Sequence, residues 1–274
     1  MQVITGNPLK NFNNEKYDNL LRKSRLRMLQ MHHESEVGHI GGNLSCLDVM
    51  LYLHHFKMME NDEFVLSKGH AAGALYITLW SLGVISDNDL KTFCKNDTIF
   101  TGHPVQMFPY IKIATGSLGH GFPVAVGMAL ANKLQYRNKH VFCLTSDGEW
   151  QEGSNWEALI FCSHHRLSNL TVIIDSNRLQ GFGRTEDIAM RGSLSERLRG
   201  FGPKVFDADG HSPETFISAF NSPSNNVKFI NLHTIKGKGV PFMENRVKWH
   251  YLTLDDELFR QACNAVDQDS VREK

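Results

Sequence analysis

Apolar and polar positions along the chain follow two periods, which predict helices in the first third and alternating strands and helices after it. Apolar residues recur at helical spacing between residues 14 and 34 and predict an amphipathic helix, which a glycine-rich break at residues 37–42 ends. These apolar residues are Tyr17, Leu20, Leu21 and Met28. We expect a second helix capped by Asn43 or Ser45, because both side chains accept hydrogen bonds from N–H groups at a helix start.

The remaining pattern is that of an α/β protein. A short buried strand is expected at residues 63–67, a helix at 71–82, and another short helix after the capping box of Ser86 and Asp89. Further expected helices are 124–134, 150–163, 213–220 and 254–266, and further strands are 140–145, 170–175, 204–207 and 227–233. This alternation predicts a central parallel sheet with helices on both faces. We expect one domain over residues 1–274, with a long loop at residues 181–203.

Composition and charge exclude two classes of partner. Hydrophobic residues make up 41% of the 274 residues and charged residues 21%, which is typical of a folded globular protein. Lys and Arg together number 29, as do Asp and Glu, so no overall field attracts nucleic acid or an anionic membrane. No apolar run approaches the roughly 20 residues of a membrane span, and the first ten residues hold no signal-peptide stretch. We therefore expect neither nucleic acid nor a membrane as a partner.

The five cysteines predict neither a disulfide framework nor a zinc site. They are odd in number, far apart, and form no Cys-x-x-Cys pair. They are Cys46, Cys94, Cys143, Cys162 and Cys263. This usage is typical of small core residues, and the expected compartment is the reducing cytoplasm.

Two polar side chains stand directly after neighbouring strands. Asp147 follows the strand at 140–145, and Asn177 follows the strand at 170–175, one strand–helix–strand unit later. Ligands of an open parallel sheet lie beyond the carboxyl ends of its strands, so the two side chains can share one ion. A carboxylate, an amide oxygen and a backbone carbonyl suit a hard divalent cation and leave positions for phosphate oxygens and water. Taken alone, Asp-Gly at a strand end is more often a turn.

Glycines and histidines form the other candidate groups. Three glycines precede an apolar helix and let backbone N–H groups approach an anion or a flat ring near its positive end; the alternative is a helix-initiating loop without a ligand. They are Gly116, Gly119 and Gly121. Single histidines beside glycine suit proton transfer near neutral pH, or else are turn residues with satisfied rings. Three histidine doublets begin at residues 32, 54 and 164, and we expect them at the surface or half-buried.

One stretch of the chain resembles a known cofactor motif. The run SDGEWQEGSNWEA at residues 146–158, followed by VIIDSNRLQGFG at 172–183, resembles the thiamine diphosphate motif of the transketolase family. The resemblance implies that Asp147 and Asn177 bind Mg²⁺ (or Ca²⁺ or Mn²⁺) through their side chains and Leu179 through its carbonyl. It also implies that Gly148 contacts the diphosphate.

Five further runs occur in the family's order and extend the resemblance over almost the whole chain. They are EVGHIGG at 36–42, LSKGHA at 66–71, TGHP at 101–104, ATGSLG at 114–119, and HTIKGKGVPFME at 233–244 with WH at 249–250. The catalytic residues that the resemblance implies are His39, His103 and His250. The implied cofactor-binding residues are His70, Gly116, Leu118, Gly148, Asn177 and His250. The chain departs from the family pattern with Ser146 for glycine, His120 for glutamine and Tyr251 for glycine.

The resemblance also implies a second polypeptide. In the family, a glutamate that activates the cofactor belongs to a separate pyrimidine-binding domain, and after residue 249 only about two dozen residues follow. The chain therefore resembles the N-terminal subunit of a split transketolase. With a C-terminal subunit that carries the glutamate, in a dimer of heterodimers, it would move a two-carbon ketol unit between sugars or sugar phosphates. The alternatives are an enzyme similar to deoxyxylulose phosphate synthase and a catalytically weakened cofactor-binding subunit.

Overall fold

The computed structural model describes residues 12–272, and these residues form two compact units. The first, which we name the histidine unit, comprises the described residues of Met1–Glu60, His70–His103 and Ile235–Lys274. The second, the sheet unit, comprises Asn61–Gly69 and Pro104–Thr234. The single domain expected over residues 1–274 stays a prediction.

The sheet unit is built on five parallel strands. They are β1 (Glu63–Leu66), β2 (Val141–Ser146), β3 (Leu170–Ser176), β4 (Lys204–Asp209) and β5 (Lys228–His233), in the spatial order β1-β2-β3-β5-β4. In the register, Ser146 lies beside Asp175, and Ser176 lies beside His233. The carboxyl ends of β2, β3 and β5 therefore meet at one edge of the sheet.

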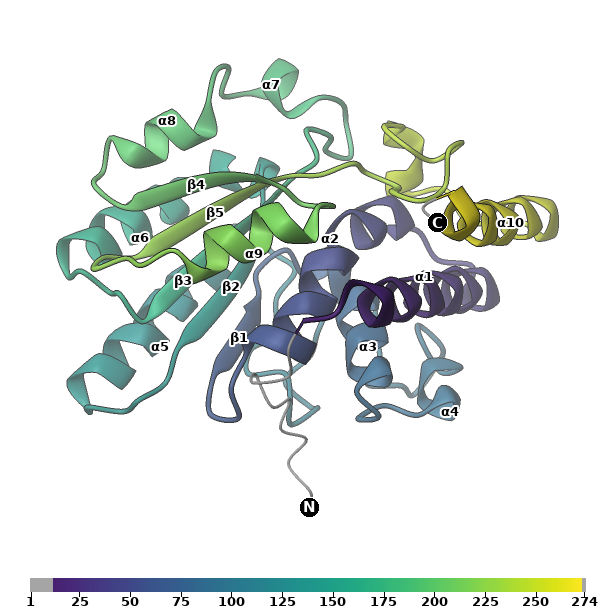
Figure 1. Cartoon of the computed structure of the whole chain (residues 1–274), viewed down its shortest axis with the longest axis horizontal. Coiled ribbons are helices and arrows are strands. Elements are labelled where there is room, and N and C mark those ends of the chain that lie inside the picture. The colour runs from purple at the N-terminus through teal and green to yellow at the C-terminus, as the bar shows by residue number, and fades with distance from the viewer. Residues whose placement is uncertain (1–11, 273–274) are drawn as a thin grey trace. The chain divides into compact units, whose positions relative to one another are not determined.

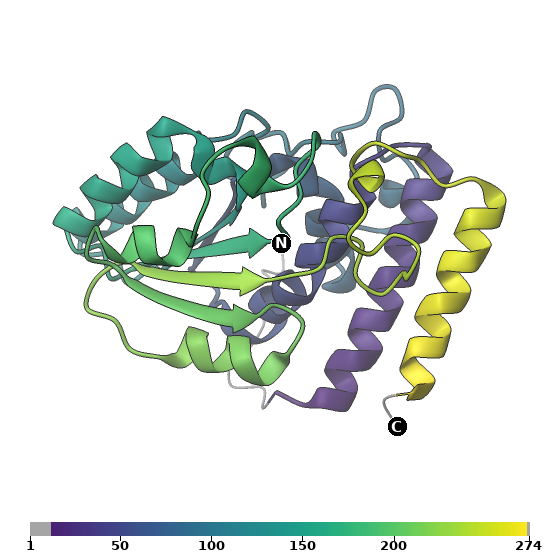
Figure 2. The ribbon, with the colours of Figure 1, turned by 90° about the horizontal axis from the view of Figure 1, so that it is seen from above.

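Helices cover both faces of this sheet, as predicted. They are α5 (Gly121–Leu134), α6 (Gly153–His164), α7 (Thr185–Ile188), α8 (Leu194–Arg199) and α9 (Pro213–Asn221), with a 3₁₀ turn η3 at Gly148–Gln151. Figures 1 and 2 show α9 on one side of the strands and α5 and α6 on the other. Strand residues alternate between these layers. Phe122 and Trp150 pack on Phe229 in one layer, and Phe142 pairs with Phe220 of α9 in the other.

The histidine unit is helical in the described residues. Its helices are α1 (Asn14–Ser35), α2 (Ile40–Tyr52), the π-helix η1 (Leu53–Lys57), α3 (Ala72–Ser81), α4 (Asp87–Leu90), η4 (Val247–His250) and α10 (Asp256–Arg272). α10 lies along α1, as Figure 2 shows, and Arg22 contacts Asp267 between them at 2.5 Å. No helix among residues 12–272 is long and apolar enough to cross a membrane.

Several local predictions can be compared with these elements. The capping box of Ser86 and Asp89 is present at the start of α4. Asn43 and Ser45 do not cap α2, because the helix begins earlier, at Ile40. The Asn43 side chain instead donates to the carbonyl of His39 at 2.8 Å and accepts from the N–H of Ala74 at 2.6 Å. The segment 181–203, expected as a loop, contains the short helices α7 and α8.

Candidate functional site

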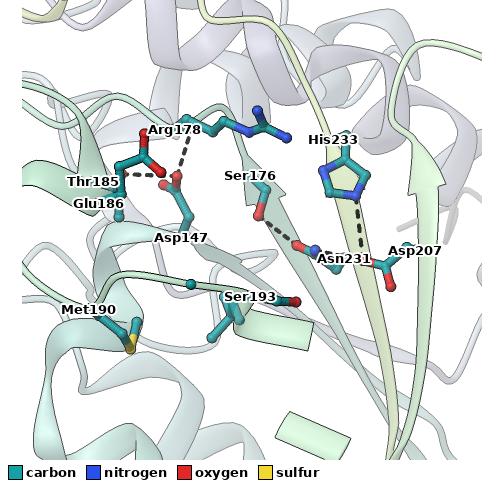
Figure 3. A pocket seen from close by; sticks show the side chains of 12 residues that line it. Asp147, Ser176, Arg178, Thr185, Glu186, Met190, Ser193, Asp207, Asn231 and His233 are labelled. Carbon is teal, nitrogen blue, oxygen red and sulfur yellow. Dashed lines mark hydrogen bonds and ion pairs between the residues drawn. The ribbon is translucent and has the colours of Figure 1, made fainter. Parts of the chain in front are cut away.

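Asp147 lies at the carboxyl end of β2 and is held by three donors. Its Oδ1 accepts from the N–H of Gly148 at 2.8 Å. Its Oδ2 accepts from the N–H of Arg178 at 2.7 Å and from the hydroxyl of Thr185 at 3.0 Å, as Figure 3 shows. The side chain is buried. The carboxylate is thus fixed in one orientation at the edge where the strands end.

The Asp147 carboxyl carries its charge at an energetic cost. Burial raises its pKa, and the nearby Asp175 carboxyl raises it further, while the three donors act in the opposite direction. A raised pKa means that the folded state disfavours the ionised form compared with the unfolded chain. A bound cation would offset this cost.

Asn177 follows β3 and presents its amide to the same edge. Its Nδ2 donates to Asp175 Oδ2 at 3.3 Å, and its Oδ1 accepts from the N–H of Leu179 at 3.1 Å. Arg178 between them has φ of 63°, a left-handed conformation that turns the chain sharply after the strand. In this turn the N–H of Arg178 donates to Asp147 and the N–H of Leu179 donates to the Asn177 amide oxygen.

The side chains of this edge fit a hard divalent cation. Asp147 has a buried carboxylate and Asn177 an oriented amide, and Leu179, whose carbonyl is the third expected ligand, follows two residues after Asn177. Within residues 12–272, no group of three or more His, Cys, Asp and Glu side chains could hold a metal. A set with only one carboxylate therefore suits an ion that takes its other ligands from a bound anion such as a diphosphate.

A buried ion pair behind Asn177 was not assigned a role by the sequence analysis. The Lys68 ammonium contacts the Asp175 carboxylate, and both side chains are fully buried. Thr234 also donates to Asp175. Asp175 in turn orients the amide of Asn177. The sequence did hold a sign of this pair: Asp175 lies inside a strand expected to be buried, and a buried charge requires a partner.

A second buried carboxyl, Glu149, fastens the glycine loop. It accepts from the hydroxyl of Ser67 and from the N–H groups of Gly119 at 3.1 Å and Ser146 at 3.3 Å. Burial raises its pKa, and these donors lower it. The sequence analysis gave Glu149 no role, although it stands between residues that it did single out.

Glycine is required at two positions of this loop. Gly119 has φ of 79°, and a Cβ there would lie 2.6 Å from the side chains of Glu152 and Ser154. Gly116 has φ of 154°, which side chains rarely allow. Leu118 lies between them, and α5 begins just beyond at Gly121. The backbone of this loop is thus closely packed and leads into the start of α5. The free N–H groups at a helix start are suited to binding an anion.

The four histidines that the resemblance assigned to the site lie together in the histidine unit. The ring centroid of His39 is 5.8 Å from that of His70, 5.9 Å from that of His103 and 5.0 Å from that of His250. The rings of His70 and His250 are 5.7 Å apart. Four runs widely spaced in the sequence therefore place their imidazoles in one cluster, which we name the histidine cluster.

Backbone contacts hold this cluster in place. His39 has φ of 67° at the start of α2, and its N–H donates to the carbonyl of His250 at 2.8 Å. Lys236 Nζ lies 3.0 Å from His250 Nδ1. Partial burial lowers the pKa of His103, although much of the residue is exposed. A neutral imidazole at His103 can accept a proton at neutral pH.

The three departures from the family pattern lie in different surroundings. Ser146 is buried as the last residue of β2, where its side chain is accommodated. His120 is exposed, and its Nδ1 lies 3.1 Å from the carbonyl of Leu118. Tyr251 lies beside the histidine cluster, with its ring 4.6 Å from that of His250.

Comparison with known proteins gives the family. Residues 20–270 match the family described as transketolase, thiamine diphosphate binding domain. The chain belongs to the transketolase family. This confirms the α/β fold and thiamine diphosphate as the cofactor of the domain.

Relatives of similar length extend this result. The chain is 39% identical over 259 residues to an apulose-4-phosphate transketolase subunit of Phocaeicola vulgatus, covering 90% of this chain and 92% of that one. It is 34% identical over 249 residues to the 6-deoxy-6-sulfo-D-fructose transketolase subunit SqwG of a Clostridium species, covering 86% and 90%. Both relatives are named as subunits. The predicted identity, an N-terminal subunit of a split transketolase, is confirmed.

A solved transketolase has the same fold. The transketolase of Campylobacter jejuni is 27% identical and superposes with a TM-score of 0.85. The match covers 93% of this chain but 43% of that one. The chain thus spans less than half of a transketolase that is made as a single polypeptide.

Proposed function

We propose that this transketolase subunit forms a complete site only with a separate subunit that supplies the pyrimidine-binding domain and a catalytic glutamate. The complex would transfer a two-carbon ketol unit from a ketose to an aldose. The observation that best supports this function is the histidine cluster, because four imidazoles gathered in one place suit repeated proton transfer to and from sugar oxygens. The names of both relatives, each of them a subunit, support the need for a partner.

The sheet unit would hold the charged end of the cofactor. Asp147, Asn177 and the carbonyl of Leu179 would bind a divalent cation, with Mg²⁺ as the first candidate and Ca²⁺ or Mn²⁺ as substitutes. Gly148 and Asn177 would contact the diphosphate. Gly116 and Leu118 would lie against the cofactor. The support is the donor chemistry described above, in which a buried carboxyl with a raised pKa lies beside an oriented amide.

Thiamine diphosphate, when bound, supplies the nucleophilic carbon that attacks the carbonyl of the ketose. The histidines have the work of moving protons. His103 is kept neutral by its lowered pKa. It would take the proton from the hydroxyl on C3 of the ketose as the C2–C3 bond breaks. A Lys236 ammonium donating to Nδ1 of His250 would place the His250 proton on Nε2, which could then donate to a sugar oxygen. His39 would share the catalytic role, and His70 and His250 would also hydrogen-bond the diphosphate.

The relatives' names suggest a class of substrate. One names a sugar phosphate and the other a sulfonated sugar, and both groups carry negative charge at neutral pH. We propose that this chain's complex also takes sugars with an anionic terminus. The assembly would be a two-fold dimer of heterodimers, since two-fold symmetry is the commonest arrangement of such complexes. We place it in the cytoplasm because all five cysteines are free thiols.

Reconstitution tests this proposal. The chain would be purified alone and also with a candidate pyrimidine-domain subunit from the same organism, each with thiamine diphosphate and Mg²⁺. We expect no ketol transfer by the chain alone, and transfer from hydroxypyruvate to aldehydes by the pair. Steady turnover by the chain alone, free of any partner, would overturn the proposal, as would an inactive pair.

A further inference from the structure

The turn after η4 is locked by its backbone against the start of α2. A Cβ at Gly38 would lie 2.7 Å from the carbonyl oxygen of Tyr251 and 2.9 Å from its Cα, so only glycine fits there. The bond between His39 N–H and the His250 carbonyl joins the same two segments. Trp249, next to this turn, is fully buried, and its indole N–H donates to the carbonyl of Phe242 at 3.2 Å. The main chain of Tyr251 therefore has little freedom.

The side chain of Tyr251 is exposed in spite of this rigid base. The residue is 60% exposed. Its ring centroid lies 4.6 Å from that of His250 at 65° and 5.8 Å from that of His39 at 66°. Its hydroxyl has no hydrogen-bond partner among residues 12–272. The molecule thus holds an aromatic ring with an available hydroxyl beside two of the four clustered histidines.

We propose that Tyr251 is a specificity-determining residue that contacts the sugar chain of the substrate. This inference rests on the proposed function of the histidine cluster. Sugars have faces made of C–H groups, which pack on aromatic rings, and hydroxyls, which a phenol can both donate to and accept from. A rigid ring at the rim of the cluster also limits the bulk of the group that lies next to it. Tyr251 therefore selects among sugars by length and by hydroxyl placement, while the histidines move the protons.

A substitution series tests this role in the complex of the chain with its partner subunit. Tyr251→Ala removes the ring, and Tyr251→Phe keeps the ring and removes only the hydroxyl. Tyr136→Ala is the matched control, because Tyr136 is 96% exposed and lies just after α5. Each variant would be assayed with hydroxypyruvate as the donor and three acceptors: glycolaldehyde, glyceraldehyde 3-phosphate and ribose 5-phosphate. Thiamine diphosphate affinity and melting temperature would be measured for each.

We expect Tyr251→Ala to change the ratio of kcat/KM between the longest and the shortest acceptor by about ten-fold, mainly through KM. Tyr251→Phe should fall between wild type and Tyr251→Ala, and Tyr136→Ala should match wild type. Cofactor affinity should not change in any of them. An unchanged ratio in an active, folded Tyr251→Ala complex overturns this inference and leaves the proposed function standing. If the wild-type complex transfers no ketol group to any acceptor, the proposed function fails and this inference fails with it.

Discussion

The two units of this chain hold their ionisable groups in opposite ways. In the sheet unit, Asp147 and Glu149 are buried carboxyls whose pKa values burial raises, and each accepts three hydrogen bonds. In the histidine unit, burial lowers the pKa values of His32, His54 and His103. The first unit thus confines negative charge, which a bound cation would stabilise, whereas burial in the second unit keeps these three imidazoles neutral.

The difference separates binding from proton transfer. A network of many donors around one carboxylate fixes position, which a metal and a diphosphate need. In the histidine cluster the ring of His39 lies 5.0 to 5.9 Å from the other three, so several imidazoles that can exchange protons are close to one another. Substitutions of Asp147 in the sheet unit and of His103 in the histidine unit should therefore affect different measured quantities.

The largest expected effect is at Asp147. Asp147→Ala should abolish metal-dependent binding of thiamine diphosphate in the complex with the partner subunit, because the remaining amide and carbonyl ligands carry no charge to balance the cation. Asp147→Asn, which keeps the acceptor shape toward Arg178 and Thr185, should also lose it. Calorimetry with and without Mg²⁺ measures both, with Asp187→Ala, a substitution of an exposed carboxylate on α7, as the control. Unchanged affinity in Asp147→Ala would show that the metal assignment is wrong.

A smaller effect, on rate rather than binding, is expected at His103. His103→Ala should lower ketol transfer by about 10²- to 10⁴-fold, the usual cost of removing a positioned acid–base group, while thiamine diphosphate still binds. His70→Ala should weaken cofactor binding more clearly. Both quantities would be measured for both variants, with His211→Ala as a control outside the cluster. If the His103 variant kept its turnover but lost the cofactor, the two roles would have to be exchanged.

The sequence carried enough to predict the sheet and the separate candidate groups. Period and alternation located every strand to within one or two residues. The central strands β2 and β3, buried on both faces, read as short apolar runs, and the edge strand β4 shows alternation. Asp147 and Asn177 were placed at neighbouring strand ends, and the register of β2 with β3 agrees. Strand positions and strand-end residues depend on neighbours close in sequence, so the sequence was sufficient to predict them.

What the sequence did not predict depends on contacts between distant residues. Lys68 and Asp175 are 107 positions apart, and Ser67 and Glu149 are 82 apart, so neither pair shows in any local pattern. The doublet histidines were expected at the surface or half-buried, yet His32 is only 1% exposed. Its burial arises from the packing of α1, which no spacing of histidines reveals. The grouping of four histidines followed only from the family resemblance.

The smallest expected effect concerns stability and tests the histidine unit alone. Burial lowers the pKa of His32 to about 4 and that of His54 to about 4, from 6.5. Because the pKa of each histidine is lower in the folded state, the unfolded chain binds more protons between pH 6.5 and pH 4. Each histidine's contribution to the free energy of unfolding is therefore full above pH 6.5 and is lost as the pH falls through this window. The loss should approach about 3 kcal/mol of unfolding free energy for each. Asp147 and Glu149, whose pKa values are raised, act with the opposite sign, because their contribution is full at low pH and is lost as the pH rises.

Comparison of variants at each pH removes the carboxyl contribution, which they share. Urea unfolding would be followed between pH 7.5 and pH 4.5 for wild type, His32→Gln and His54→Gln, with His165→Gln as an exposed control. His32→Gln should be less stable than wild type at pH 7.5, since it loses the packing of a buried ring and the contact of Nδ1 with the Val37 carbonyl at 3.2 Å. Its stability should nevertheless fall less steeply on acidification, by up to about 1.4 kcal/mol per pH unit. A slope equal to that of wild type would mean that folding does not lower the pKa of His32, and the contrast between the two units would then rest on His54 and His103.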